Sequence, residues 1–211
     1  MEKNLHNKNI NTHKNIFVMN INLKKSTLRS ASLLVLLLIQ QSQLVAQNSS
    51  TADSLIKSDS LKLGDTYGGG MIFYLDATGQ HGLIAAPMDQ KSNAQWGFFN
   101  EQVSAQALTI GSGLSNTRKI AKAGKKQKIA AVICYNLELN GFTDWYLPSK
   151  EELEAMYANL KLKHLGNFSS NDYWSSSETD FNNAWIVDFM RGFSIEKNVV
   201  TPACVRAIRS F

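Results

Sequence analysis

Six basic side chains lie within residues 118–128, and no acidic residue stands among them. They are Arg118, Lys119, Lys122, Lys125, Lys126 and Lys128. A helix is expected to begin near Thr117, with Ser115 or Asn116 as its N-cap, and to carry the first three. Such a segment is commonly a solvated helix face and the loop after it. Concentrated positive charge also attracts anionic polymers, so the second interpretation is a surface for a sulfated or uronic glycan.

A second group of polar side chains lies between residues 178 and 185. Its oxygen-bearing members are Glu178, Asp180, Asn182 and Asn183. Carboxylate and amide oxygens at this spacing can hold Ca²⁺ or hydrogen-bond a sugar. Phe181 and Trp185 flank the group and offer rings on which a sugar can stack, although Trp185 can instead pack inward. The same composition is also usual in simple solvated turns, and both interpretations stay open.

No catalytic constellation accompanies these two groups. Beyond residue 46 the histidines are His81 and His164, which are too few for a zinc shell. There is no Gly-x-Ser-x-Gly elbow, and the serines of residues 175–177 are expected to serve the structure beside a core Trp174. We therefore predict a protein that is not an enzyme and has no cofactor, with Ca²⁺ as the one alternative.

The elements that must position these groups are organised around residues 140–160. Gly141 can adopt the left-handed conformation that ends a helix, so a helix is expected to stop at Asn140. An apolar run at residues 145–147 follows and is expected to be buried. Residues 130–137 place apolar side chains at helical spacing and predict the helix that ends there.

A further helix is predicted to begin after Ser149. Ser149 and Glu152 have the spacing of a capping box, in which the hydroxyl and the carboxylate each accept a backbone N–H. Behind them an apolar stripe follows at i, i+3, i+4 and i+7, consisting of Leu153, Met156, Tyr157 and Leu160. This helix should pack its apolar stripe onto the same core as residues 145–147.

Apolar runs on both sides of the helices predict strands. Residues 71–75 and 83–87, separated by a glycine-containing turn, indicate a β-hairpin. Later strands are expected at residues 173–176, 184–189 and 203–211. We therefore expect an α+β domain in which an antiparallel sheet carries two main helices on one side.

The last predicted strand contains two arginines. Arg206 and Arg209 lie three residues apart and so should point to opposite faces of a strand. One of them is expected to pair with a buried carboxylate such as Asp144 or Asp188.

The front of the chain has the features of a secretory signal peptide. A basic region that contains Lys24, Lys25 and Arg29 precedes an uncharged, leucine-rich stretch at residues 31–39. Ala46 offers a cleavage site, and the apolar stretch is shorter than the ~20 residues that span a bilayer. We expect residues 1–46 to be an extension and signal peptide, 47–64 a short polar tether, and 65–211 a single domain. An uncleaved anchor is the alternative.

Removal of residues 1–46 changes the charge of the protein. That segment holds six of the 22 basic residues and one of the 17 acidic residues, so 16 of each remain. The mature chain is net neutral, and its composition gives no support for nucleic-acid binding. We expect export to the medium or the cell surface, with no stable membrane span after cleavage.

Several motifs together resemble a known family. In chain order they are HGLIAAP, IGSGLSNT, AAVICYNLELNGFTDWYLPSKEELEAMY, YWSSSE, AWIVDF and VRAIRSF. They resemble the bacterial domain found at the C-terminus of the Legionella collagen-like adhesin, over residues 64–211. That family is similar to C-type-lectin-like domains and, more distantly, to formylglycine-generating enzymes. The resemblance implies a C-type-lectin-like fold and a secreted or surface domain for binding, with adhesion to sulfated glycans known for one type of member.

The chain departs from both of those relatives. It lacks the Glu-Pro-Asn, Gln-Pro-Asp and Trp-Asn-Asp motifs with which C-type lectins bind sugar through calcium. The oxygenase chemistry of formylglycine generation needs two neighbouring metal-binding cysteines, and this chain has only Cys134 and Cys204. In an exported protein two cysteines suggest a disulfide, and their placement resembles the helix-to-final-strand bridge of lectin-like domains. Two buried free thiols are the alternative.

These observations favour a binding module over an enzyme. The expected partner is a glycan or another anionic surface polymer, recognised in an adhesion-like role without catalysis. The alternatives are an enzyme distantly related to formylglycine-generating enzymes and a structural subunit of a surface assembly.

Overall fold

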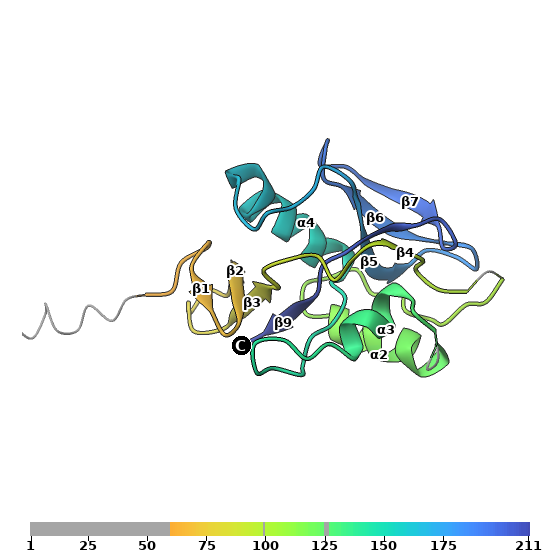
Figure 1. Ribbon diagram of the computed structural model, residues 1–211, viewed down its shortest axis with the longest axis horizontal. Coiled ribbons are helices and arrows are strands. Elements are labelled where there is room, and N and C mark those ends of the chain that lie inside the picture. Colours follow the sequence, from red (N-terminus) through yellow and green to blue (C-terminus); the bar gives the residue numbers. More distant parts are fainter. Residues whose placement is uncertain (1–59, 99, 125–126) are drawn as a thin grey trace, which may run out of the picture. The chain divides into compact units, whose positions relative to one another are not determined.

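Two β-sheets and three α-helices make up the part of the chain that the computed structural model describes, which is residues 60–98, 100–124 and 127–211 (Figure 1). The first sheet contains, in spatial order, β1 (Thr66–Tyr67), β2 (Gly70–Leu75), β3 (Gly82–Ala85) and β9 (Ile208–Ser210). The second contains β4 (Lys91–Ala94), β8 (Ala203–Val205), β5 (Asp172–Glu178), β6 (Asn183–Asp188) and β7 (Ser194–Asn198). The helices are α2 (Gly113–Ala123), α3 (Ala130–Tyr135) and α4 (Lys150–Asn159), with a 3₁₀ turn at Lys161–Lys163. The predicted signal peptide and most of the predicted tether lie outside the described residues.

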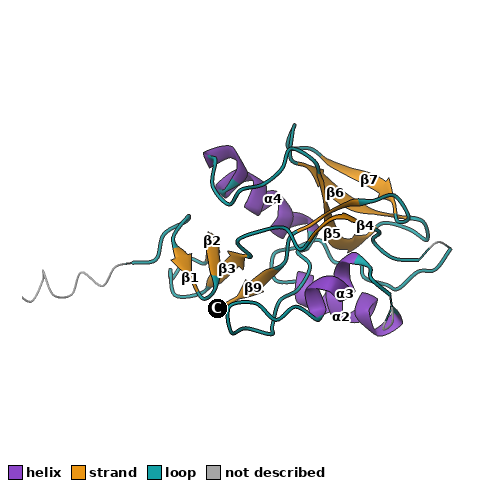
Figure 2. Ribbon diagram, in the orientation of Figure 1, coloured by secondary structure: helices purple, strands orange, loops and turns teal. Residues whose placement is uncertain are grey.

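The mixed α+β class with mostly antiparallel strands is confirmed. All strand pairs are antiparallel except β5 with β8, which run parallel at Tyr173 and Cys204. The predicted hairpin is formed by β2 and β3. We expected two main helices on one side of a single sheet, whereas the described residues form three helices and two sheets (Figure 2).

The five-stranded sheet is covered by helices on both faces. On β5, Tyr173 packs into the cluster that contains Leu153 and Met156 of α4, whereas its neighbour Trp174 packs into the cluster of α2 and α3. Neighbouring residues of a strand point to opposite faces, so α4 covers one face and α2 with α3 the other. The sequence patterns could not distinguish this arrangement from a one-sided sheet, because both bury the same apolar residues.

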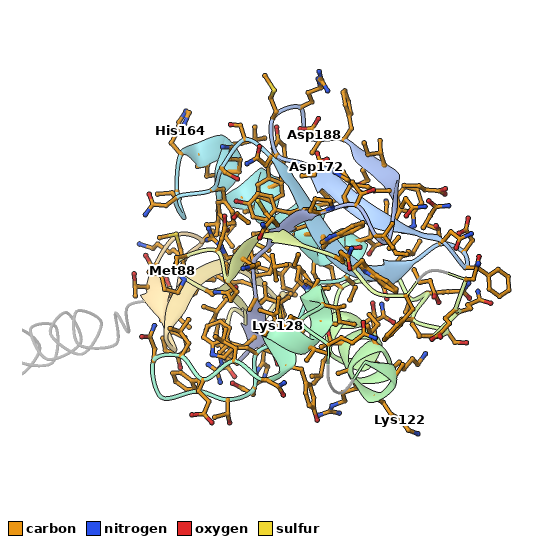
Figure 3. All side chains as sticks on the ribbon, turned by 45° about the vertical axis from the view of Figure 1, so that its right-hand side comes forward. Met88, Lys122, Lys128, His164, Asp172 and Asp188 are labelled. Atoms are coloured by element: carbon orange, nitrogen blue, oxygen red, sulfur yellow. The ribbon has the colours of Figure 1, made fainter. Side chains whose placement is uncertain are left out.

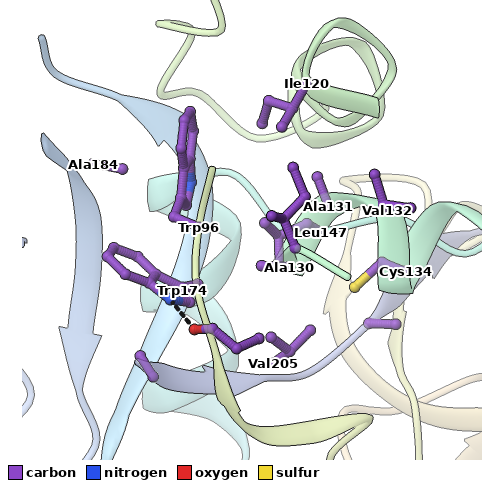
Figure 4. Packing of buried hydrophobic residues seen from close by; sticks show 14 of the residues in the cluster. Trp96, Ile120, Ala130, Ala131, Val132, Cys134, Leu147, Trp174, Ala184 and Val205 are labelled. Atoms are coloured by element: carbon purple, nitrogen blue, oxygen red, sulfur yellow. Dashed lines mark hydrogen bonds between the residues drawn. The ribbon is translucent and has the colours of Figure 1, made fainter. Parts of the chain in front are cut away.

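The core on the side of α2 and α3 is built around tryptophans. Trp96 and Trp174 are fully buried with Ile120 of α2 (Figure 4). Trp145 is also buried and belongs to the same cluster. The indole N–H of Trp174 donates to the carbonyl of Ala94 at 2.9 Å, so its one polar group is satisfied inside the core. The burial predicted for residues 145–147 is confirmed.

Helix α4 begins as predicted. Ser149 is its N-cap, the Ser149 hydroxyl accepts from the Glu152 N–H, and the Glu152 carboxylate accepts from the Ser149 N–H. The predicted capping box is therefore confirmed. Both residues are fully buried, so the box also belongs to the core.

The prediction that a helix ends at Asn140 is wrong. Helix α3 ends at Tyr135, and Leu139 pairs with Phe142 through two backbone hydrogen bonds of 3.0 Å. Asn140 and Gly141 both have positive φ, 53° and 80°, which is the requirement of a two-residue type I′ turn. Gly141 has the left-handed conformation that we expected, but it serves a tight hairpin turn instead of a helix end.

The last predicted strand is divided between the two sheets. Residues 203–205 belong to β8 of the five-stranded sheet, and residues 208–210 belong to β9 of the four-stranded sheet. The crossing places Arg206 inside the protein, where its guanidinium pairs with Asp89 at 2.7 Å and stacks on Phe168. Arg209 pairs with Asp144, one of the two carboxylates expected, although the Asp144 side chain is 54% exposed and not buried.

Candidate functional site

Helix α2 carries the first part of the basic segment on its solvent face. The helix begins at Gly113, earlier than predicted, because the side chains of Asn116 and Thr117 are buried and bind other parts of the protein instead of capping. Asn116 donates to the Ala107 carbonyl, and the Thr117 hydroxyl accepts from the N–H of Leu147. These contacts fix the rotation of the helix about its axis, so its opposite face is held toward solvent.

Arg118 and Lys122 line a shared depression on that face. They follow at i and i+4, so both lie on one side of the helix. Together with Ala121 and Tyr135 they enclose about 340 Å³, and the Tyr135 side chain is 48% exposed. Lys122 projects outward near the end of α2 (Figure 3). Two cations and an aromatic ring in one shallow depression suit an anionic ligand that also presents an apolar face.

The other two described basic residues, Lys119 and Lys128, do not line this depression. The Lys119 ammonium donates to the carbonyl of Ser104 at 2.7 Å and so supports the loop before the helix. Lys128 lines a different pocket, next to Lys91. Lys125 and Lys126 lie outside the described residues. Of the four basic residues in this segment that the structure describes, Arg118 and Lys122 line the same depression.

The structure gives Glu178 a structural role in the oxygen-rich group. Glu178 is only 2% exposed. Its carboxylate accepts hydrogen bonds from the N–H groups of Val103 and Ala105 at 2.9 and 3.3 Å. It ties the long loop before α2 to the end of β5. The oxygens of Glu178 are thus directed into the protein and not toward a surface ligand.

The remaining oxygen-bearing residues are engaged with one another. The Asp180 carboxylate accepts from the Asn182 N–H at 2.7 Å and from the Asn183 carboxamide at 3.0 Å, and these bonds hold its pKa below the ordinary value. The Asn182 side-chain oxygen accepts from the N–H of Asn100. Among the described residues no group of three or more His, Cys, Asp or Glu side chains is arranged to hold a metal ion. The side-chain oxygens of Asp180 and Asn182 are thus already engaged in hydrogen bonds within the protein.

The two aromatic residues beside this turn differ in exposure. Phe181 lies in the turn itself and is 57% exposed, whereas Trp185, on β6, is half-buried. The Lys150 ammonium lies 5.1 Å from the centre of the Trp185 ring and covers part of it. A sugar would have to displace this lysine before it could stack on that face of Trp185.

A family model described as the Lcl C-terminal domain matches residues 87–209, which is more than half of the chain. The chain belongs to the Lcl C-terminal domain family. The match includes all three described helices and the five-stranded sheet, so both candidate surfaces lie within the family's own region. Strands β1 to β3 precede it.

No curated protein matches the chain. A fimbrial protein from Bacteroides ovatus ATCC 8483, known from a crystal structure at 1.85 Å resolution, is similar with a TM-score of 0.49 and 14% sequence identity. The similarity covers 70% of this chain and 48% of that one, so the chain spans about half the length of the fimbrial protein.

The serines of this Lcl domain at residues 175–177 are structural, as predicted. All three are fully buried in β5. The Ser175 hydroxyl donates to the Trp185 carbonyl, and the Ser177 hydroxyl donates to the Ala107 carbonyl. These bonds join β5 to β6 and to the loop before α2. Among the described residues, none of the three serine hydroxyls is hydrogen-bonded to a His, Lys, Asp or Glu side chain.

The structure does not contain the disulfide expected between Cys134 and Cys204. Both residues are buried free thiols. Cys134 packs in the cluster beside Val205, whereas Cys204, the neighbour of Val205 on β8, packs in the other cluster (Figure 4). Because neighbouring strand residues point to opposite faces, the sheet itself separates the two sulfurs. Burial raises the pKa of both thiols, which disfavours the reactive thiolate.

The sequence did not predict a partly buried polar network around Asp89. The Asp89 carboxylate accepts from the Arg206 guanidinium and, at 2.8 Å, from the Tyr173 hydroxyl. Arg206 also donates to the carbonyls of Ala86 and Gly166. The partners lie up to 120 residues apart in the chain, and no local sequence pattern indicates such a contact. In this Lcl domain the network locks the crossing between the two sheets.

The helices of the described region are all short. None of them is long and apolar enough to cross a membrane.

Proposed function

We propose that this protein is an exported, non-enzymatic binding module that recognises an anionic surface polymer in an adhesion-like role. The observation that carries the proposal is the depression formed by Arg118, Lys122 and Tyr135 on the solvent face of α2. Membership of the Lcl C-terminal domain family supports a surface binding role. We also infer that the fold is C-type-lectin-like, as the family resemblance implies, and that the leader directs export.

The helix itself favours a polymer with repeated negative charges. The first turn of α2 contains no acidic side chain, and its last turn contains Lys122. No described ion pair involves Arg118 or Lys122, so their charges are available to a ligand. Each exposed contact of this kind is weak and is screened over ~8 Å at physiological salt. Useful affinity would therefore come from several contacts along one polymer.

The buried thiols argue against the enzymatic alternative. A cysteine that acts as a nucleophile or binds a metal does so as a thiolate, usually beside a cationic group or a helix N-terminus. Here burial raises the pKa of both Cys134 and Cys204, and they lie on opposite faces of one sheet. This is the reverse of the neighbouring, ionisable pair that formylglycine-type oxygenase chemistry needs.

Salt-gradient elution from immobilised heparin tests the proposal. The parent is residues 47–211, and the test variant is Arg118→Ser with Lys122→Ser. The matched control is Lys62→Ser with Lys163→Ser, which removes two positive charges from exposed positions elsewhere. We expect the parent and the control to elute at similar salt, and the test variant to elute at much lower salt because its ion pairs with the polymer are lost.

Two further measurements make the result decisive. The free energy of unfolding of the test variant should stay within about 0.5 kcal/mol of the parent, because both side chains are on the surface. A third variant, Lys125→Ser with Lys126→Ser, measures the contribution of the two lysines outside the described residues. If the test variant elutes with the parent, or if test and control shift equally, the depression on α2 is not the binding surface.

A further inference from the structure

A second pocket, beside β4, combines lysines from two separate parts of the chain. It encloses about 460 Å³, a size typical of small-ligand sites. Its lining residues are Lys91, Asn93, Gln95, Lys128, Val200 and Pro202, together with Ala94. Apart from Lys128, none of these residues stood out in the sequence, because no local pattern connects residues 91–95 with residues 200–202.

Backbone hydrogen bonds hold the walls of this pocket together. The Trp96 N–H donates to the carbonyl of Val199, and the Ala130 N–H donates to the carbonyl of Gln95, each at 2.9 Å. The Gln95 carboxamide adds a bond of 3.1 Å to the carbonyl of Val200. The pocket is therefore formed by three segments that are bonded to one another before any ligand arrives.

The polar groups of the pocket suit a ligand that is both anionic and rich in hydroxyl groups. Among the described residues, the ammonium groups of Lys91 and Lys128 and the carboxamide of Asn93 have no hydrogen-bond or ion-pair partner. None of the lining residues is acidic. An ammonium offers three donors to a carboxylate, and a carboxamide both donates and accepts, as sugar hydroxyls require.

We propose that this pocket binds a carboxylate-bearing sugar of one or two rings, such as a uronic acid. The two ammonium groups would hold the carboxylate, Asn93 would bind ring hydroxyls, and Val200 with Pro202 would contact the apolar C–H face. An extended peptide fits less well, because the Gln95 carbonyl and the Trp96 N–H are already bonded and cannot pair with an added strand. The site is separate from the α2 depression and does not depend on polymer binding there.

Titration of the isotope-labelled chain with glucuronate, followed by NMR, tests this assignment. We expect the side-chain amide signals of Asn93 and Gln95 to shift as glucuronate is added, until the site is saturated. Glucose and acetate serve as neutral-sugar and simple-anion controls. Both should bind about tenfold more weakly, because glucose lacks the carboxylate and acetate lacks the ring hydroxyls. An acidic peptide, acetyl-Ala-Asp-Ala-amide, tests the excluded ligand class. Equal binding of acetate would reduce the site to an unspecific anion site, and tighter binding of the peptide would overturn the sugar assignment.

Variants separate this site from the proposed polymer surface. Lys91→Gln should weaken glucuronate binding about tenfold, since it removes a charged hydrogen bond, and should leave elution from heparin unchanged. Arg118→Ser with Lys122→Ser should lower the salt concentration at which the protein elutes from heparin and should leave glucuronate binding unchanged. Lys128 is left intact because it belongs to both sets of candidates. Unchanged glucuronate affinity in Lys91→Gln overturns the pocket proposal, whatever the heparin result shows for α2.

Discussion

The carboxylate of Glu152 accepts a hydrogen bond from the backbone N–H of Gly111, which lies 2.8 Å away and 41 residues earlier in the chain. It also accepts from the N–H of Ser149 at 2.7 Å. Gly111 lies just before α2, and Ser149 is the N-cap of α4. One fully buried carboxylate therefore caps the N-termini of two helices that pack on opposite faces of the sheet.

Replacement of Glu152 by Gln should destabilise the protein. The change places an NH₂ donor against backbone N–H donors and leaves a buried group unsatisfied, so we expect the free energy of unfolding to fall by about 2 kcal/mol. Urea denaturation measures it. Glu101→Gln is the control, because Glu101 is exposed, and it should stay within about 0.5 kcal/mol of the parent. Equal effects of the two substitutions would contradict the double-capping role.

Ser149→Ala should lower the free energy of unfolding by about 1 kcal/mol, as expected for the loss of an N-cap. Ser149 also donates to the Thr109 carbonyl at 2.9 Å, which the substitution removes. Ser115→Ala is the matched control. Ser115 is exposed inside α2 and is not its cap, so this change should have almost no effect. If Ser115→Ala lowered the free energy of unfolding more than Ser149→Ala does, Ser115 would be the N-cap of α2, as the sequence predicted.

Asp144→Asn should destabilise the protein in a pH-dependent way. The Arg209 guanidinium donates to both Asp144 oxygens, at 2.7 and 2.8 Å, and holds the pKa of that carboxyl below its usual value of 3.8. The ionised carboxylate therefore contributes stability above the unfolded-state pKa, and this contribution is lost as the pH falls through the lower folded-state pKa. We expect a difference of about 1 kcal/mol at pH 7, allowing for solvent screening of the half-exposed Asp144.

Urea denaturation of the parent and Asp144→Asn at neutral and strongly acidic pH measures this difference. The gap between the two proteins should narrow at acidic pH, where the parent carboxyl is also neutral. A gap that stays constant or widens would show that the ion pair with Arg209 is not its source.

Both cysteines should behave as protected free thiols. The folded protein should resist alkylation at Cys134 and Cys204, because both are buried, and should incorporate two labels once unfolded without a reducing agent. Mass spectrometry of the labelled protein counts the modified thiols. Recovery of the two cysteine peptides joined to each other would contradict the structure.

Local patterns in the sequence predicted local structure well. The capping box of Ser149 and Glu152 spans only four residues, and the helix that it begins is present as predicted. The predicted start of α2 was wrong because contacts with distant parts of the chain decide it. Asn116 and Thr117 are good capping residues in isolation, but the folded chain uses their side chains to bind Ala107 and Leu147. Tertiary contacts thus overrode a local preference.

The candidate sites depend still more on distant contacts. The pair Arg118 and Lys122 was included in the basic segment, but the contribution of Tyr135 to the same depression follows from the packing of α3 on α2. Glu178 was grouped with Asp180 by proximity in sequence, although its carboxylate belongs to the interior. Sequence spacing reports neighbours along the chain, whereas burial and convergence are decided by segments that lie far apart in it.

The division of residues 203–210 between β8 and β9 has a consequence for biogenesis. Strand β8 lies between β4 and β5, and β9 closes the sheet that begins with β1 and β2. Neither sheet can be completed until these late residues have been synthesised, and their pairings with β3 and β4, over 100 residues earlier, are slow to form. Completion of either sheet must therefore wait until nearly the whole chain has been made, so folding of this domain is coupled to its last few residues.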